Sequence, residues 1–389
     1  MKSNSTKTII LILFILTLLS GYNYFYRPFL KKFEAQKAAE AILSNITPEP
    51  TISNLQKTIN NLSVEEKIWQ LISIPISLDN DSEASTETKF ISQVNPGFIT
   101  IFGKNISLET TRNFTNSLPV SLGGYVPLIA VDHEGGTVQR LTGKGFTKLE
   151  SWESMCEKSE GLRINVFETS ARELRSAGVN VVFAPIVDVP RDGSFLKTRA
   201  CENQINSLIT AEDYIKTFGS QGILSVIKHY PGIGSATKDM HFYKTELAIE
   251  AQDTAPFQRI LADFPNIGVM SSHVIVAGKT DNLPCSLSEV CLNPFPVHFP
   301  DVLLFTDALE MASAQITEDG EEKTLGEIAY LAIKAGNHVV VFGEKVSQEE
   351  IKQVVNYLSM KYQEEPEFSA KVEASVAKIL DLKLPEEIK

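Results

Sequence analysis

The feature that most constrains the fold of this chain is a series of apolar runs of strand length that alternate with segments of helical periodicity. The eight runs are Leu71–Ile76, Phe98–Phe102, Leu128–Val131, Val179–Val187, Ile223–His229, Ile267–His273, Val302–Thr306 and Val339–Phe342. A strand that is apolar on both faces is typical of a parallel sheet covered by helices. Eight such strands in one α/β chain favour a single (β/α)8 barrel of the TIM type over an open doubly wound sheet.

Segments of helical period follow most of these runs. The clearest are Glu65–Leu71, Glu160–Ala177, Thr210–Gln221, Ala251–Asp263, Thr324–Ala335 and Val372–Leu382. After the eighth apolar run only about 45 residues remain, so we expect no second domain behind the barrel.

A continuous apolar segment, residues 8–26, lies close to the N-terminus. Its length is just enough to span a bilayer, and its aliphatic core, Ile9–Leu19, has the length of the apolar region of a signal peptide. Tyr22, Tyr24 and Phe25 stand where cleavage would require small residues, and aromatic side chains suit the membrane interface. These residues favour an uncleaved membrane anchor over a cleaved, secretory signal.

We therefore predict three parts: a membrane anchor or signal segment at 1–28, a stem and linker at 29–54, and the barrel domain at 55–389. The anchor would hold the protein at the cell membrane with the barrel outside the cytoplasm. If the segment is cleaved instead, the protein is secreted.

Charge and cysteine content exclude several classes of protein. The chain has 36 basic and 48 acidic residues, a net charge of −12, and no basic patch, so we do not expect nucleic-acid binding. Its four cysteines include no Cys-x-x-Cys pair, which argues against a disulfide scaffold and against a structural zinc site. The closest pair, Cys285 and Cys291, is expected to be two free thiols, and cysteine content does not decide the compartment.

Ionisable residues stand at the carboxyl ends of most predicted strands, where the active site of a barrel lies. They are Asp132 and Glu134, Asp188, Lys228 and His229, His273, and Asp307. Carboxylates and histidines suit either metal-dependent hydrolysis or glycoside hydrolysis, which needs a nucleophilic carboxylate and a separate acid/base. A metal-dependent barrel of the amidohydrolase type needs a His-x-His pair, and this chain has none, so we predict no metal and no cofactor.

Three blocks of sequence carry most of these residues: VDHEGGTVQR at 131–140, KHYPGIGSATKDMH at 228–241 and LFTDALEM at 304–311. They resemble signature blocks of glycoside hydrolase family 3, in particular its single-domain β-N-acetylhexosaminidase branch. The segments at 62–71 and 375–383 resemble the opening and closing helices of that family. The resemblance covers residues 55–384 and does not extend to the N-terminal segment.

The resemblance implies three catalytic residues. Asp307 matches the nucleophile, which forms a covalent glycosyl-enzyme, although an isolated aspartate there would also suit the N-cap of a helix over 308–313. Asp239 and His241 match the dyad in which the aspartate orients a histidine that serves as general acid and then base. The glycine-bordered segment 232–241 is expected to be a mobile loop that closes the dyad over substrate. Other branches take the acid from a C-terminal domain.

The resemblance also implies a set of sugar-binding residues: Asp132, Arg140, Arg199, Lys228 and His229. Arg199 is the weakest match, because its Arg-Ala-Cys departs from the usual Arg-Ser-Phe of the family. Glu134 and Asp188 are expected to hold loops by hydrogen bonds. His273 could line the pocket or be a satisfied histidine at a strand end.

Four residues depart from the family pattern without removing a catalytic atom: His133, Thr137, Ile233 and Met240. The function implied is a retaining exo-β-N-acetylglucosaminidase that removes terminal N-acetylhexosamine from glycans or peptidoglycan fragments. Two alternatives stay open: a β-glucosidase-type exo-glycosidase of the same family, and a catalytically weak glycan-binding protein. The sequence gives no oligomeric state.

Overall fold

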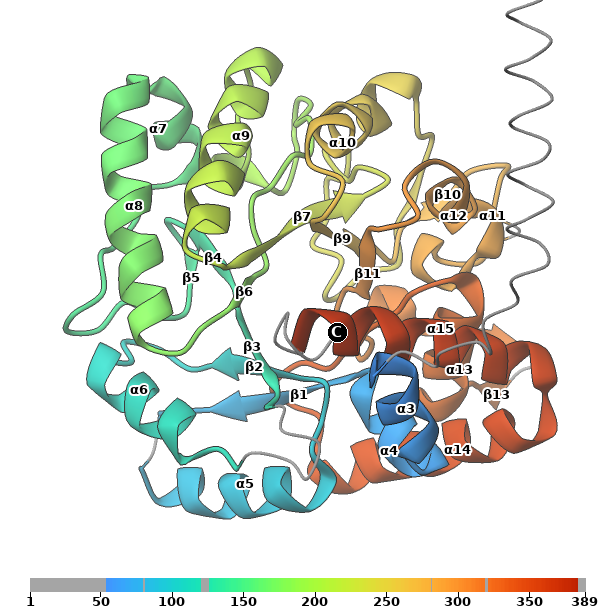
Figure 1. Cartoon of the computed structure of the whole chain (residues 1–389). Coiled ribbons are helices and arrows are strands. Elements are labelled where there is room, and N and C mark those ends of the chain that lie inside the picture. Colours follow the sequence, from blue (N-terminus) through green and yellow to red (C-terminus); the bar gives the residue numbers. More distant parts are fainter. Residues whose placement is uncertain (1–53, 80, 120–125, 281, 319–320, 384–389) are drawn as a thin grey trace, which may run out of the picture. The chain divides into compact units, whose positions relative to one another are not determined.

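The eight predicted strands form a nearly closed parallel barrel (Figure 1). The computed structural model describes residues 54–383 except 80, 120–125, 281 and 319–320. The barrel strands are β1 (Ile72–Ser77), β2 (Phe98–Phe102), β3 (Leu128–Val131), β6 (Val181–Val182), β7 (Leu224–Tyr230), β9 (Gly268–Ser271), β11 (Leu303–Thr306) and β14 (Val340–Val341). Each pairs with the next in chain order, β14 pairs with β1, and a single parallel bridge between Phe305 and Val339 links β11 to the β14 segment.

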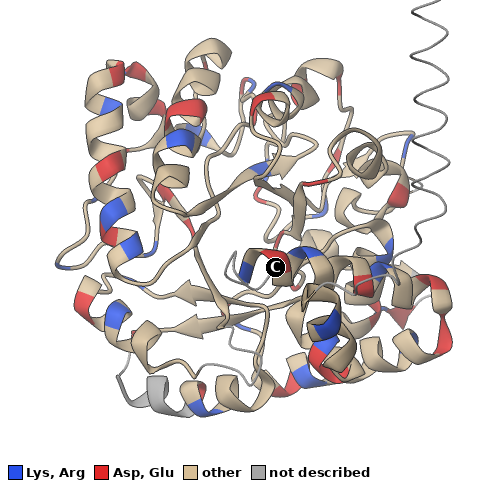
Figure 2. Cartoon of the chain, viewed as in Figure 1, with Lys and Arg blue, Asp and Glu red and all other residues tan. Residues whose placement is uncertain are grey.

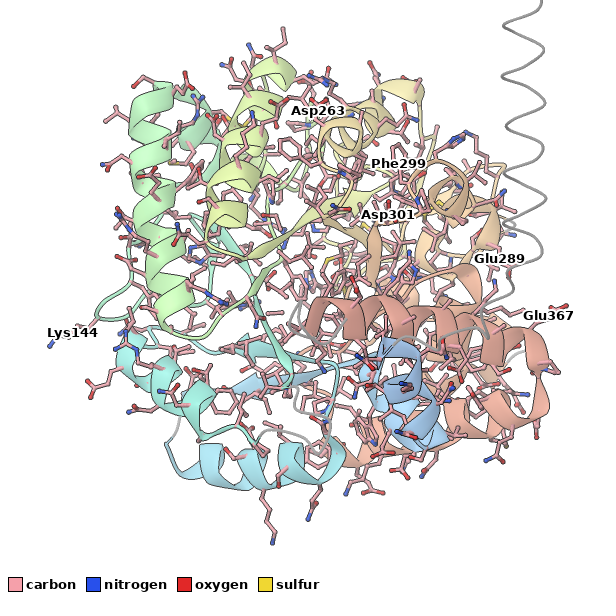
Figure 3. The ribbon with its side chains drawn as sticks, in the orientation of Figure 1. Lys144, Asp263, Glu289, Phe299, Asp301 and Glu367 are labelled. Carbon is pink, nitrogen blue, oxygen red and sulfur yellow. A yellow bond between two sulfur atoms is a disulfide. The ribbon has the colours of Figure 1, made fainter. Side chains whose placement is uncertain are left out.

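Helices surround the strands (Figure 1). They are α3 (Asn54–Asn61), α4 (Val64–Gln70), α5 (Asp81–Val94), α6 (Leu108–Ser117), α7 (Trp152–Glu157), α8 (Glu160–Ser176), α9 (Gln204–Ser220), α10 (Ala251–Asp263), α11 (Glu289–Leu292), α12 (Pro294–His298), α13 (Leu325–Ala335), α14 (Gln348–Glu364) and α15 (Pro366–Lys383). Charged residues of both signs are spread over these outer helices (Figure 2). Figure 3 shows Lys144 and Glu367 pointing away from the barrel, whereas apolar side chains fill the space between strands and helices.

Local signals in the sequence begin several of the helices. The side chains of Ser63, Thr324 and Ser347 each accept a hydrogen bond from the backbone N–H three residues later. The carboxylate of the glutamate at that later position accepts the backbone N–H of the cap residue in return. Such capping boxes satisfy backbone groups that the first turn leaves unpaired. Helix α6 was not predicted from the sequence, because it buries only Thr111 and Phe114 and so has a narrow apolar stripe.

The fourth predicted strand differs most from the structure. We expected Val179–Val187, whereas the regular ladder covers only the two residues of β6. Pro185 has no N–H to donate within this segment. The chain nevertheless stays beside β7, since the Val187 N–H donates to the Lys228 carbonyl at 3.0 Å.

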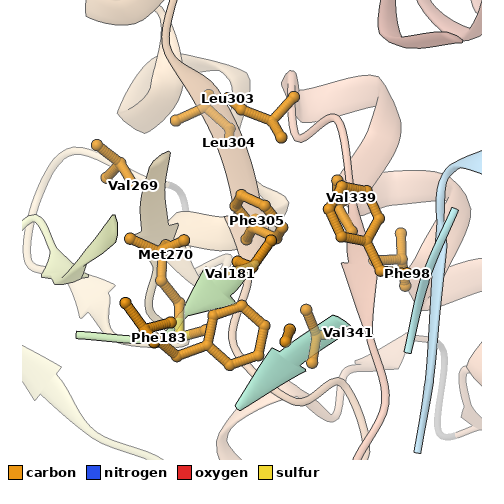
Figure 4. Packing of buried hydrophobic residues seen from close by; sticks show 14 of the residues in the cluster. Phe98, Val181, Phe183, Val269, Met270, Leu303, Leu304, Phe305, Val339 and Val341 are labelled. Atoms are coloured by element: carbon orange, nitrogen blue, oxygen red, sulfur yellow. The ribbon is translucent and has the colours of Figure 1, made fainter. Parts of the chain in front are cut away.

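Buried apolar side chains pack against one another in the core, and the aromatic rings of Phe98, Phe183 and Phe305 lie among them (Figure 4). The ring of Phe305 meets Phe98 and Phe183 edge to face, with centroids 5.3 and 5.7 Å apart. Phe183, Met270 and Val341 also line the cavity above this core. The packed interior therefore forms the floor of the site.

A two-stranded hairpin follows β3 at the carboxyl end of the barrel. It pairs β4 (His133–Gly135) with β5 (Val138–Gln139). Gly135 has a φ of +92°, and a Cβ there would lie 2.2 Å from the Glu150 carbonyl, so only glycine fits this turn. The hairpin returns Arg140 to the end of β3, where its N–H donates to the Asp132 carbonyl at 3.2 Å.

The cysteine prediction is wrong, because all four cysteines are paired. Cys285 bonds to Cys291, and Cys156 bonds to Cys201. A short 3-10 turn followed by α11 brings the Cα atoms of the first pair to 5.3 Å. The second pair is 45 residues apart, and only tertiary structure brings its Cα atoms to 6.4 Å, within disulfide range.

The predicted anchor and most of the stem, residues 1–53, lie outside the described residues. None of the helices in the described part combines the length and apolar character that crossing a bilayer requires. Asp307 does not cap a helix over residues 308–313, which was the alternative role that the sequence allowed. A turn follows Asp307, and then a 3-10 helix, Ala312–Ala314.

Candidate active site

A cavity of about 340 Å³ opens at the carboxyl ends of the barrel strands. Seven of the eight predicted site residues line it: Asp132, Arg140, Arg199, Lys228, His229, His241 and Asp307. The eighth, Asp239, contacts His241 and is not among the lining residues. The structure thus gathers the predicted residues in one place, although they come from segments spread over 176 positions, from 132 to 307.

A chain of alternating charges forms one wall of the cavity. The Lys228 Nζ lies 2.9 Å from Asp132 Oδ1 and 2.6 Å from Glu134 Oε1. Arg199 donates to both Glu134 oxygens, from Nε at 2.8 Å and from Nη2 at 2.9 Å. Arg140 Nη2 lies 3.4 Å from the other Asp132 oxygen. Glu134 therefore holds Arg199 and Lys228, as expected for a residue that supports a loop.

These contacts fix the ionisation of the wall. Burial opposes the charge on Asp132, but Lys228 and Arg140 outweigh it and hold the pKa of this carboxyl well below its usual range. In the same way Lys228 and Arg199 lower the pKa of the buried Glu134. Burial disfavours the Lys228 ammonium, yet Asp132 and Glu134 raise its pKa. At neutral pH the wall presents fixed charges to a ligand.

His229 is oriented by Asp188 from the neighbouring segment. One Asp188 oxygen accepts hydrogen bonds from the backbone N–H of His229 at 3.0 Å and from its Nδ1 at 2.8 Å. The other oxygen accepts the Ile233 N–H at 2.8 Å. Asp188 thus fixes the imidazole and the turn that follows it, and leaves Nε2 of His229 for other partners.

Asp307 stands directly after β11. Its N–H donates to the Ser271 carbonyl at 2.9 Å, and its Oδ1 accepts the Ala308 N–H at 2.8 Å. Burial tends to raise the pKa of Asp307, but the histidines His229, His273 and His241 lower it overall. Asp307 is therefore a carboxylate at neutral pH, which is the form a nucleophile requires.

Asp239 and His241 form a hydrogen-bonded pair on the loop between β7 and β8 (Glu246–Leu247). Asp239 Oδ1 accepts from the His241 N–H at 2.9 Å and from its Nδ1 at 2.7 Å. The pair is largely exposed, with 57% of the His241 side chain accessible. The Ala312 N–H donates to the His241 carbonyl at 3.2 Å, which attaches this loop to the segment after Asp307.

The structure shows the surroundings of three residues whose role the sequence left open. His273 is a satisfied histidine: its Nδ1 pairs with Ser286 Oγ at 2.7 Å and its Nε2 with the Ala308 carbonyl at 3.0 Å. Ile233 and Met240 are buried and line the cavity with apolar surface. The two departures from the family pattern therefore change the lining and leave the dyad intact.

Sequence reasoning missed Glu310 and Phe242. Glu310 lines the cavity three residues after Asp307, and its Oε2 accepts the Gly343 N–H at 3.0 Å. Burial first, and then the Asp307 charge, raise the pKa of this carboxyl. Phe242 lines the cavity directly after His241. Both belong to or adjoin the quoted sequence blocks, but only the folded loops show that they face the cavity.

The carboxylates of the site are engaged with basic side chains or backbone N–H groups. Within the described ranges, no cluster of three or more His, Cys, Asp or Glu side chains is arranged to hold a metal ion.

Residues 63–382 match the Glycosyl hydrolase family 3 N terminal domain. The chain belongs to glycosyl hydrolase family 3. That match includes the barrel and all eight predicted site residues, so this family 3 chain is a glycoside hydrolase.

Two relatives of this family 3 glycosidase bear the name beta-hexosaminidase. This chain is 32% identical over 260 residues to a protein named beta-hexosaminidase from Chromobacterium violaceum. The alignment covers 62% of this chain and 71% of that one. A protein of the same name from Thioalkalivibrio sulfidiphilus is 29% identical over 290 residues, which is 69% of this chain and 80% of the other. The crystal structure of a beta-N-acetylhexosaminidase from Beutenbergia cavernae shares the fold, with a TM-score of 0.72 at 22% identity over 82% of this chain and 98% of that one.

Proposed function

We propose that this family 3 chain is a retaining exo-β-N-acetylhexosaminidase that removes terminal β-linked N-acetylglucosamine from glycans or peptidoglycan fragments. The observation that carries the proposal is that the Asp307 carboxylate and the His241 imidazole line one cavity beside a wall of fixed charges. Two catalytic groups of this kind are what a double-displacement glycosidase needs. The name beta-hexosaminidase, which the relatives bear, supports the amino sugar as substrate.

In the first step, an Asp307 oxygen attacks the anomeric carbon and the bond to the leaving group breaks. The protonated His241 gives the proton on Nε2 to the departing oxygen, while Asp239 holds Nδ1. In the second step, His241 takes a proton from water, the water oxygen bonds to the anomeric carbon, and the bond to Asp307 breaks. Two displacements at one carbon retain its configuration.

The charged wall would bind the sugar hydroxyls. Asp132 accepts hydrogen bonds, and Lys228, Arg140 and Arg199 donate them, all from positions fixed by ion pairs. Charged hydrogen bonds in a buried site discriminate strongly against a sugar that lacks the matching hydroxyl. Recognition of one terminal sugar residue in this way gives exo-cleavage.

The Asp307→Ala variant tests the proposal. We expect it to lose at least about 10⁴-fold in kcat for a chromogenic N-acetyl-β-glucosaminide, because the covalent step is removed. A 5-fluoro glycosyl fluoride of the substrate should label the wild type on Asp307, as mass spectrometry of the digested protein would show. Full activity in the variant, or a label elsewhere, would overturn the assignment of the nucleophile.

The substrate class is tested with paired aryl glycosides that differ only in the 2-acetamido group. Preference for the acetamido sugar supports the proposal, and preference for the glucoside identifies a β-glucosidase-type enzyme. Binding of saccharides to the unmodified protein without turnover would instead identify a glycan-binding protein.

We also propose that the protein is held at the cell membrane by residues 1–28 with the barrel outside the cytoplasm. Two disulfides support an oxidising compartment, where such bonds persist. The test is fractionation of cells that express the full chain, followed by protease treatment of intact protoplasts. Membrane-bound, protease-accessible barrel is the expected result, and protein in the cytoplasmic fraction would contradict it.

A further inference from the structure

The dyad loop carries an unusual surface. In the described part of the chain, only two Phe, Tyr or Trp residues are exposed, Phe242 at 68% and Tyr243 at 52%, and they are consecutive. They follow His241 directly. A Phe exposed to water has an unfavourable contact with solvent that a bound apolar face would relieve.

The loop geometry holds Phe242 at the cavity. The N–H groups of Phe242 and Tyr243 both donate to the Asp239 carbonyl, at 3.1 and 3.2 Å, which makes a tight turn. The centroid of the Phe242 ring lies 6.3 Å from that of His241. The bond from Ala312 to the His241 carbonyl attaches this turn to the segment after Asp307. The ring of Phe242 is therefore placed relative to the dyad.

The two aromatic rings have different surroundings. Phe242 lines the cavity, whereas Tyr243 is not among the lining residues. The Lys238 ammonium lies 5.2 Å from the centroid of the Tyr243 ring, a cation–π contact within the loop. Tyr243 thus has a partner in the loop itself, and Phe242 presents its ring to whatever occupies the mouth of the site.

The chemistry of His241 determines what that occupant is. The histidine protonates the oxygen between the bound sugar and the leaving group, so the leaving group must lie beside it, on the outer side of the cavity. A pyranose ring has a face of C–H groups that packs on an aromatic ring and removes apolar area from water. The residue next to the acid is where such a ring would lie.

We propose that Phe242 is the specificity-determining residue for the leaving group, and that it binds a pyranose ring through the face of its own ring. This inference rests on the proposed hexosaminidase activity, and it adds which residue binds the sugar on the reducing side of the bond that is cut.

The test compares two substrates that both need protonation by His241: a β-linked N-acetylglucosamine disaccharide, whose leaving group is a ring, and methyl N-acetyl-β-glucosaminide, whose leaving group is not. Phe242→Ala should lower kcat/KM for the disaccharide about 10-fold, in line with the strength of aromatic packing, and change the methyl glycoside less than about 2-fold. Phe242→Trp should restore the disaccharide rate. Tyr243→Ala is the matched control and should leave both substrates unchanged.

Equal losses on the two substrates would show that Phe242 only positions His241, and no loss on the disaccharide would show that the ring is not used. Either result overturns this inference alone. Failure of the wild type to hydrolyse both substrates would instead overturn the proposed function.

Discussion

Lys228 is the residue on which the charged wall depends. Its buried ammonium joins Asp132 and Glu134, and through Glu134 it is linked to Arg199. Each charge is buried with an opposite partner, so loss of any one leaves another without compensation. The ion pairs that we propose to bind the sugar therefore also hold the site together.

Acid should destabilise the fold through these groups. Asp132, Glu134 and Asp307 all have a pKa below the ordinary values of 3.8 and 4.5. A carboxyl with a lowered folded pKa binds protons more weakly than in the unfolded chain, so its stabilisation is full above the unfolded pKa and is lost as the pH falls through the folded value. The buried His133, His273 and His338 also have a pKa below the ordinary 6.5, so the stability that depends on their neutral form is lost as the pH falls below about 6.5. The melting temperature should therefore decline from about pH 6.5 and fall more steeply below about pH 4.

Thermal unfolding of the wild type and of Glu134→Gln at several pH values measures this effect. The variant should melt at a lower temperature at pH 7, and its loss of stability on acidification should be smaller, because one of the titrating groups is gone. A melting temperature that is independent of pH down to pH 3 would contradict the prediction.

Replacement of His241 should affect substrates according to their leaving groups. We expect His241→Ala to slow the first step about 10²- to 10⁴-fold for an alkyl glycoside, which needs a proton on its oxygen. A 2,4-dinitrophenyl glycoside leaves without one, and its first step should change far less. Pre-steady-state kinetics on both substrates measure the difference. Equal losses would remove the acid role, and Asp239→Asn should give a smaller loss of the same pattern.

Arg199 and the residues directly after it are held by an ion pair and by a disulfide. Arg199 pairs with Glu134, and two residues later Cys201 bonds to Cys156 on α7. In the segment between β6 and α9, helical structure is limited to a short 3-10 turn, Lys197–Arg199. The disulfide therefore constrains an element that has few hydrogen bonds of its own.

The two disulfides should differ in their effect on stability. In the chain-entropy description, a bridge across 45 residues contributes about 4 kcal/mol and one across 6 residues about 2 kcal/mol. The double variant Cys156→Ser/Cys201→Ser should lose more unfolding free energy than Cys285→Ser/Cys291→Ser, and should also have a raised KM because Arg199 is less restrained. Denaturant unfolding and steady-state kinetics measure both, and a larger loss in the second variant would contradict this.

The nearly closed barrel surrounds an apolar core that contains three aromatic rings in contact. Phe305 is fully buried, packs against Phe98 and Phe183, and belongs to the only bridge that links β11 to Val339 within the described residues. Interior packing at this point supports both the seam of the barrel and the floor of the cavity. Stability and activity should therefore both depend on it.

Phe305→Ala should lower the free energy of unfolding by about 3–5 kcal/mol, the cost of a large cavity in a core. The exposed Val290→Ala serves as control and should change it by less than about 0.5 kcal/mol. Denaturant titration followed by circular dichroism measures both. A loss below 1 kcal/mol in Phe305→Ala would show that the core is less tightly packed than the structure indicates.

Much of the fold was predictable because its signals are local. The apolar runs at β2 and β3 have the predicted bounds, and the strand-end residues Asp132 and Asp307 lie in the cavity as expected. The pairing of Cys156 with Cys201 was not predictable, because no local pattern connects residues that meet only through tertiary structure. Asp239 and His241 were placed through resemblance to a family, since nothing in the loop sequence by itself points to the cavity.

By itself the sequence determined the eight strands, their parallel arrangement and the set of ionisable residues at the strand ends. These features follow from local runs of apolar residues and from their order along the chain. The tertiary structure decided which charges meet. It set Lys228 between Asp132 and Glu134, joined the four cysteines, and aimed Phe242 at the mouth of the site. These contacts join residues far apart in the chain or depend on how a loop turns, and only the folded barrel fixes the distances between them.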